Sequence, residues 1–97
     1  MSTYILLCNY TDQGIRAVKD SPKRRAASRE LGKKLGVDVK AAYLAVGAYD
    51  IVLIAEASSD EAMAKWALST ASKGNIRTTT IKVFPEAEYD KILAAVE

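Results

Sequence analysis

The 97-residue sequence fits a single domain, residues 1–97, and contains 14 Lys and Arg, 12 Asp and Glu and no His, for a formal net charge of +2 at pH 7. Without His, the chain cannot supply a histidine general base, a Ser-His-Asp triad or a haem-ligating His. The single cysteine, Cys8, cannot form an internal disulfide, and one Cys without His argues against a metal site. The sequence contains no apolar run long enough to span a membrane and no signal-peptide pattern at its start. We therefore expect a cytoplasmic protein without metal or cofactor.

The first predicted strand covers residues 3–10, TYILLCNY. Alternate side chains of a strand point to opposite faces, so Leu6 and Cys8 share one face while Ile5 and Leu7 share the other. Both faces are apolar, whereas a strand with one solvated face alternates apolar and polar residues. The strand therefore needs a cover on each side. A polar loop with a short helical turn follows it.

A helix is predicted from Pro22 to about Leu35, with Ser21 as its N-cap and Gly36 as its C-terminal cap. Gly32 lies inside this helix, where glycine lowers helix stability by about 1 kcal/mol relative to Ala. Close packing of the helix on a sheet would explain why a glycine is present there.

Basic residues concentrate on this helix. Residues 16–40 contain nine bases and three acids, a local charge of +6. We interpret helix 22–35 as a solvated basic face rather than a nucleic-acid footprint, because no aromatics interleave the bases. Binding of acidic partners or nucleic acid remains a weaker alternative. Lys23, Arg24 and Arg25 also oppose the helix dipole, and such departures from local rules sometimes mark function.

Two apolar runs, 37–46 and 51–57, are joined by Gly47-Ala48-Tyr49-Asp50 and predict a hairpin. Run 51–57 is apolar on both faces, like the strand predicted over residues 3–10. Run 37–46 is more polar, which suits a strand at the edge of a sheet. A second helix begins at Ser58 or Ser59, and its inward stripe includes Met63 and Trp66. Trp66 is interpreted as core.

The last predicted strand covers residues 75–84 and is rich in Thr, which also suits an edge. A terminal helix is predicted over 86–96, with an apolar side and a need for a surface on which to dock.

The order βαββαβ with a C-terminal helix predicts an α+β, ferredoxin-like fold with a four-stranded antiparallel sheet. The two most apolar strands, the first and the third, are the central pair of that arrangement. Both helices would cover one sheet face. Leaving the other apolar face in water would cost several kcal/mol at about 25 cal/mol per Å². We therefore expect a homodimer or a larger even-numbered oligomer.

Four stretches in this order resemble the GYD domain proteins: residues 11–16 (TDQGIR), 20–24 (DSPKR), 47–52 (GAYDIV) and 74–78 (GNIRT). The resemblance covers residues 3–84, with Ala48 inside the Gly-x-Tyr-Asp motif. It implies a bacterial or archaeal protein with the dimeric α/β barrel fold. The wider superfamily contains monooxygenases, haem binders and sensing modules, so the resemblance implies no particular activity.

Polar residues at the predicted strand ends and loops are candidates for binding a ligand: Gln13, Arg16, Lys19, Tyr49, Asp50 and Arg77. Residues 13–16 suggest a site for a small anion, for which a loop-closing role is the alternative. Tyr49 and Asp50 suggest a proton-transfer pair, against the simpler interpretation that Asp50 ties the turn.

Two functions are therefore retained. The first is a non-enzymatic, homo-oligomeric module that binds a ligand or serves assembly. The second is a cofactor-free enzyme of the monooxygenase or isomerase kind that uses Tyr49 and Asp50. The absence of a tunable histidine base favours the first.

Overall fold

The computed structural model describes all 97 residues and contains one four-stranded antiparallel sheet. Its strands lie in the order β2-β3-β1-β4. They are β1 (Ser2–Tyr10), β2 (Val37–Leu44), β3 (Ile51–Ala57) and β4 (Ile76–Val83). The prediction that the two most apolar strands occupy the centre is confirmed, as is the ferredoxin-like fold.

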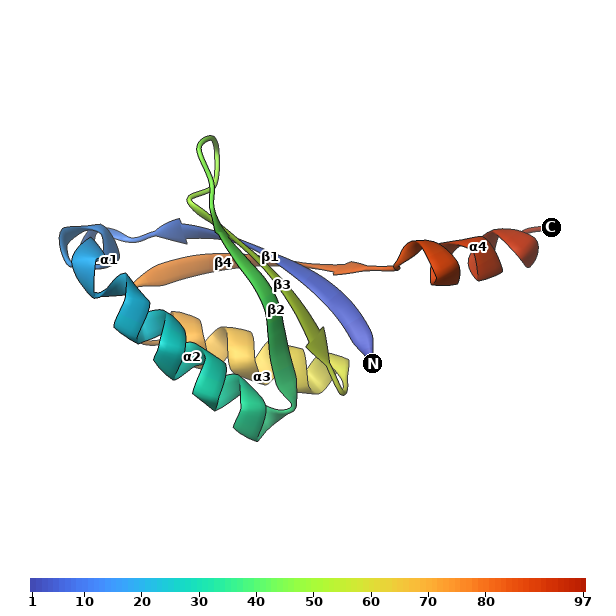
Figure 1. Cartoon of the computed structure of the whole chain (residues 1–97), viewed down its shortest axis with the longest axis horizontal. Coiled ribbons are helices and arrows are strands. Elements are labelled where there is room, and N and C mark those ends of the chain that lie inside the picture. The colour runs from blue at the N-terminus through green and yellow to red at the C-terminus, as the bar shows by residue number, and fades with distance from the viewer.

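Two long helices, α2 (Ser21–Leu35) and α3 (Asp60–Ala71), lie side by side across one face of the sheet (Figure 1). The short α1 (Asp12–Arg16) and the 3-10 turn η1 (Val18–Asp20) connect β1 to α2. The last helix, α4 (Glu86–Ala94), stands away from the sheet and from the other helices. None of these helices combines the length and apolar character needed to cross a membrane.

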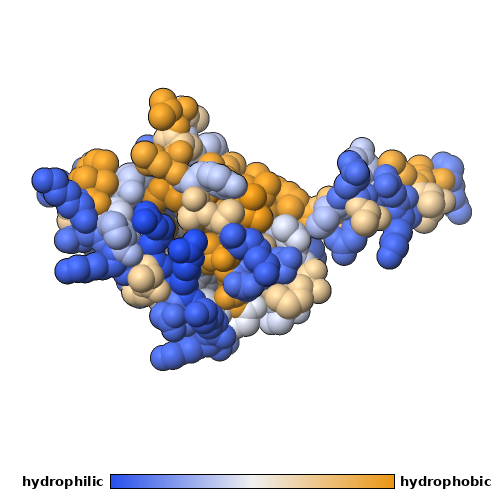
Figure 2. All heavy atoms as spheres, in the orientation of Figure 1, coloured by the Kyte–Doolittle hydropathy of each residue, from blue (hydrophilic) through white to orange (hydrophobic).

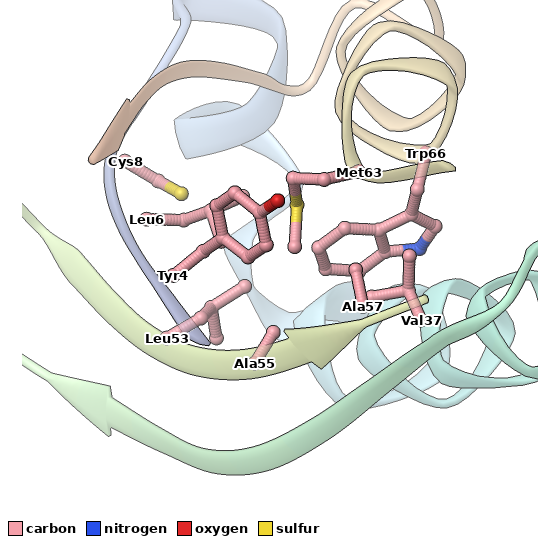
Figure 3. Packing of buried hydrophobic residues seen from close by; sticks show 9 residues of the cluster. All are labelled: Tyr4, Leu6, Cys8, Val37, Leu53, Ala55, Ala57, Met63 and Trp66. Atoms are coloured by element: carbon pink, nitrogen blue, oxygen red, sulfur yellow. The ribbon is translucent and has the colours of Figure 1, made fainter. Parts of the chain in front are cut away.

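The core lies between the sheet and the two helices (Figure 3). Trp66 and Met63 from α3 are 1% and 2% exposed and face side chains of β1 and β3. The core consists of Tyr4, Leu6, Cys8, Val37, Leu53, Ala55, Ala57, Met63 and Trp66. The interpretation of Trp66 as core is confirmed, and its indole Nε1 donates a hydrogen bond to the carbonyl of Ser28 at 2.9 Å.

Gly32 allows α2 to approach this core closely. A Cβ at that position would lie 2.8 Å from the carbonyl oxygen of Val37 and 3.3 Å from Nε1 of Trp66. Real Cβ atoms do not approach a backbone oxygen so closely, so any larger residue would push α2 away. The close packing of α2 thus offsets the helix stability that is lost by having glycine at position 32.

The predicted N-cap of α2 is wrong by one residue. Asp20 occupies the cap position without a side-chain hydrogen bond, and Ser21 lies inside the helix. The Ser21 hydroxyl instead lies 3.1 Å from the hydroxyl of Tyr10 and accepts a hydrogen bond from Arg24. The preceding 3-10 turn brings the chain into the helix directly, so no side-chain cap is needed to redirect it. Gly36 ends α2 with φ 87°, as predicted.

Other boundaries differ slightly from prediction. β2 ends at Leu44 rather than at Val46, because the backbone N–H of Ala45 donates to Asp50 O and closes the loop. A register shift between Val39 and Ala41 brings Ala42 opposite Leu53. Of the two residues predicted to cap α3, Ser58 and Ser59, it is Ser59 whose hydroxyl accepts from the N–H of Ala62. The terminal helix ends at Ala94.

Candidate protein-binding surface

The sheet face opposite α2 and α3 is apolar and has no cover within the chain. Alternation along β1 and β3 places Ile5, Leu7, Val52 and Ile54 on this open face, where all four remain half-buried. The ladder pairs Ile5 with Ile54 on one side and with Ile81 of β4 on the other. Ile81 is 42% exposed. A row of β-branched and aliphatic side chains therefore crosses three strands on the open side.

The dimensions of the protomer also indicate an incomplete surface. Its radius of gyration is 14.6 Å, against about 12.5 Å for a compact domain of this length. Its accessible surface is 6519 Å², against about 5,400 Å² for a monomeric protein of this mass. The surplus, on the order of 1,000 Å², resembles what one partner buries in a standard interface, about 800 Å².

A projecting loop contributes to that surplus. The connection between β2 and β3 rises beyond the end of the sheet, and its tip is apolar (Figures 1 and 2). Leu44 is 80% exposed and Val46 is completely exposed. Such side chains are common singly on surfaces, but two at one projecting tip beside the half-exposed Tyr43 form a patch suited to a partner.

The arm formed by α4 is the other contributor. Its apolar side consists of Tyr89, Ile92, Leu93 and Val96, each exposed by 45% or more. Figure 2 shows the arm separated from the body, with hydrophobic and charged residues both in contact with solvent. The predicted need of this helix for a docking surface is not met by its own chain. A helix this short is marginal in water without packing.

Six of the chain's 14 Lys and Arg residues lie on α2, and hydrophilic side chains cover its outer face in Figure 2. Among the six bases of this helix, only Lys33 forms an ion pair, with Glu30 at 3.3 Å, and both side chains are largely exposed. The remaining charge on the helix is not neutralised by acidic side chains of the protomer.

The predicted pair Tyr49 and Asp50 lies at the base of the projecting loop. The Asp50 carboxylate accepts a hydrogen bond from the backbone N–H of Tyr10 at 2.9 Å, and its own N–H donates to Cys8 O at 2.9 Å. Asp50 thus fastens the loop to the end of β1. Tyr49 is half-buried and its hydroxyl makes no hydrogen bond, so the geometry lends no support to proton transfer.

The other predicted site residues gather around the same end of β1. The Gln13 side-chain amide donates to Lys73 O at 3.1 Å and to the Asn75 side chain at 3.0 Å, which closes the loop between α3 and β4. Arg77 pairs with Asn9 in the β1–β4 ladder and is exposed, as are Arg16 and Lys19. These three bases make no ion pair, and none of the six residues lines either of the two main cavities.

A polar cluster that the sequence did not predict lies at the opposite end of β1. Tyr4 donates a hydrogen bond to Asp60, which also accepts from Lys82 Nζ at 3.0 Å. The hydrogen bonds from Tyr4 and then Lys82 lower the pKa of Asp60, while burial and the bond to Asp60 raise the pKa of Tyr4. The cluster ties the start of α3 to β1 and β4. Its members come from three separate elements, so no local motif reveals it.

Cys8 lies in the core with no exposed surface. Burial raises the pKa of its thiol to about 11, which leaves little thiolate at neutral pH. A buried, protonated thiol of this kind is chemically unreactive.

Comparison with known proteins gives one family and one curated relative. The GYD domain model matches residues 4–93. The relative, from Thermus thermophilus, is named "Glutamine synthetase and cystathionine beta-lyase binding protein". It is 35% identical over 89 residues, which cover 91% of this chain and 94% of the relative.

Solved structures agree on the fold. A feast or famine regulatory protein from M. tuberculosis, solved with L-methionine, superposes with a TM-score of 0.65 at 17% identity. The match covers 88% of this chain but only 51% of the regulatory protein, so this chain spans about half of it. The protein FFRP-DM1 superposes with a TM-score of 0.60 at 22% identity, covering 87% of this chain and all of FFRP-DM1.

Proposed function

Because this chain belongs to the GYD domain family, we propose that it is a non-enzymatic protein-binding module that acts as a homodimer or larger even-numbered oligomer in the cytoplasm. In this proposal residues 1–97 form one GYD-type domain. Two copies pair through the open faces of their sheets, as in a dimeric α/β barrel. The basic outer face of α2 is left free to bind a second protein.

The open sheet face is the observation that carries the dimer. Two such faces, related by a two-fold axis, bring the row containing Ile5, Leu7 and Ile54 against the same row of the second copy. Burying about 800 Å² per copy, slightly more than half of it apolar, gives gross stabilisation on the order of 10 kcal/mol per copy before the cost of association. No other element of the chain covers this face in the structure, since α2 and α3 lie on the opposite face and α4 stands away from the sheet (Figure 1).

The arm α4 suits the same assembly. It follows β4, an edge strand of the sheet, and extends away from the body of its own protomer (Figure 1). Its apolar side, centred on Ile92 and Leu93, would then lie against the second copy rather than in solvent. Docking on a partner supplies the packing that a short helix needs.

The T. thermophilus relative supports a protein as the bound partner, since its name describes binding to glutamine synthetase and cystathionine beta-lyase. At 35% identity over almost the whole chain, we extend this to enzymes of that kind. The uncompensated charge of α2 favours an acidic surface on the partner, since complementary charge accelerates association and makes it sensitive to salt.

Light scattering across a concentration series tests the dimer. We expect twice the protomer mass or a larger even multiple at micromolar concentration. A folded protein with the mass of one 10.5 kDa chain at that concentration would contradict the proposal.

Binding to purified glutamine synthetase and cystathionine beta-lyase from the source organism tests the partner. Lys34→Glu, on the outer face of α2, should weaken binding at low salt by about tenfold. Lys65→Glu, an exposed substitution on α3, is the matched control and should change affinity little. If the protein binds neither enzyme, the proposed partner is wrong, while the proposal of a dimer is unaffected.

A further inference from the structure

A cavity of about 150 Å³ lies between the sheet and the helices α2 and α3, at one edge of the core. Its floor is apolar and comes from the strands, with Cys8, Ile51, Leu53 and Ile76. It lies on the helix side of the sheet, so a dimer formed through the open face leaves it unoccupied by the second copy.

The cavity exists because both helices present small side chains there. Ala27 and Ser28 of α2 and Thr70 of α3 line it, where larger residues would fill the space. Ala27 is exposed even though it lies on the apolar stripe of α2 that continues with the half-buried Leu31 and Leu35. Farther along the helices, Trp66 closes the same interface completely. The opening is therefore local to the first half of α2.

The rim of the cavity is basic and contains no acidic side chain. Arg24, Arg25 and Lys73 all line it. Arg24 is fixed by protein acceptors, since its guanidinium donates to Ala17 O at 2.9 Å, to Gly14 O at 3.3 Å and to the Ser21 hydroxyl at 3.2 Å. Arg25 and Lys73 make no side-chain hydrogen bond or ion pair, so their charge is available to a ligand.

Two hydroxyls add to the polar side of the cavity. Tyr10 and Ser21, both lining residues, lie 3.1 Å apart, oxygen to oxygen. One hydroxyl donates to the other, which leaves one hydroxyl proton free to donate to an anionic oxygen. The cavity thus has basic and hydroxyl hydrogen-bond donors beside an apolar floor.

We propose that this cavity binds a small monocarboxylate whose apolar body is about the size of a benzene ring. An apolar cavity of similar volume in another protein accommodates benzene, which sets the size of the body. Arg25 forms a charge-assisted pair with the carboxylate at the rim, and a guanidinium can bind both carboxylate oxygens. The position of Arg25 near the start of a helix, unfavourable to the helix dipole, is explained by this role.

The same lining argues against an amino acid as the ligand. A zwitterion brings an ammonium group, and no carboxylate lines the cavity to accept its charge. Placing that ammonium beside Arg25 and Lys73 costs free energy, because like charges repel. The site therefore favours a carboxylate without an amine, and this inference does not depend on the dimer or on the protein partner.

Titration calorimetry and amide NMR shifts with phenylacetate as the probe test the proposal on the full chain. We expect phenylacetate to shift the amides of Cys8, Ser28 and Ile76. Phenylacetamide, phenethylamine and phenylalanine should each bind at least about tenfold more weakly. Arg25→Gln should weaken phenylacetate binding by about tenfold, while Lys23→Gln, an exposed neighbour outside the cavity, should change it less than about twofold.

Filling the cavity supplies a second variant. Ala27→Leu should abolish the shifts, and circular dichroism should show an unchanged helical fold because Ala27 is exposed on its helix. The proposal is overturned if phenylacetate shifts no amide of the cavity at millimolar concentration. It is equally overturned if phenylalanine or phenylacetamide binds as tightly as phenylacetate, or if Arg25→Gln and Ala27→Leu leave binding unchanged.

Discussion

The two central strands carry apolar residues on both faces of the sheet, but the two faces have different environments. Leu6 is 1% exposed beneath α2 and α3, while Leu7, the next residue of the same strand, is only half-buried on the open face. The difference comes from the connections, since both β-α-β crossovers place their helices on the same side. A residue's own character thus does not decide its burial here. The open face has the composition of a core that still lacks its second layer.

Leu6→Ala should have the largest effect on stability. Removing a buried Leu side chain typically lowers the free energy of unfolding by about 2–5 kcal/mol. Leu7→Ala is the matched variant on the other face. Urea unfolding should give the Leu6→Ala loss at any protein concentration, and a loss for Leu7→Ala that depends on concentration. Equal, concentration-independent losses would remove the distinction between the faces.

Leu7→Lys should break the open-face interface while sparing the protomer. A lysine here would be buried opposite the second copy without a partner, at a cost of several kcal/mol. Sedimentation velocity should show a monomer with native circular dichroism. Thr79→Lys changes the exposed residue that pairs with Leu7 in the β1–β4 ladder. It should weaken the same interface less than Leu7→Lys does. A Leu7→Lys variant that sediments like the unmodified protein would place the interface elsewhere.

Truncation after Pro85 should produce an intermediate effect. It removes α4, whose apolar side has no contact surface in its own chain, so the sheet and the helices α2 and α3 should keep their stability. Self-association should weaken by about tenfold, measured as the dimer dissociation constant. A substantial loss of protomer stability in dilute solution would instead mean that the arm folds back on its own body.

Asp60→Asn should have a small effect that depends on pH. The folded pKa of Asp60 is lowered by its hydrogen bonds with Tyr4 and Lys82, so its contribution is present above the unfolded pKa of 3.8 and disappears as pH falls through the folded value. Unfolding curves of the variant and the unmodified protein should differ at pH 7 and converge at about pH 2. Glu61→Gln, beside it on α3 and without an ion pair, is the control. A difference that persists in acid would assign the effect to packing.

Tyr49→Phe should have the smallest effect. The Tyr49 hydroxyl makes no hydrogen bond, so the free energy of unfolding should change by less than about 0.5 kcal/mol. The matched variant Asp50→Asn should destabilise more, because the Asp50 carboxylate accepts from the backbone of Tyr10. If Tyr49→Phe unfolds the protein, the phenolic oxygen has a structural role that the protomer does not display.

Local patterns predicted the elements well where each residue's role depends on its neighbours in sequence. Gly36 and Ser59 mark helix ends because the αL conformation and the side-chain cap are local. Ser21 was misplaced because a 3-10 turn, which has no clear sequence signal, precedes it. Among the candidate site residues, Gln13 and Asp50 make contacts with segments that are distant in sequence, 60 and 40 residues away, so their partners could not be predicted.

By itself, the sequence determined the order of elements, the central position of β1 and β3 and the need for a cover on both of their faces, because these follow from periodicity and hydrophobicity. Tertiary structure alone decided which face α2 and α3 cover, that α4 finds no surface in its own chain, and that Arg25 and Lys73 meet over an apolar cavity. Each of these depends on the path of the chain in space, which brings together residues that no local pattern connects.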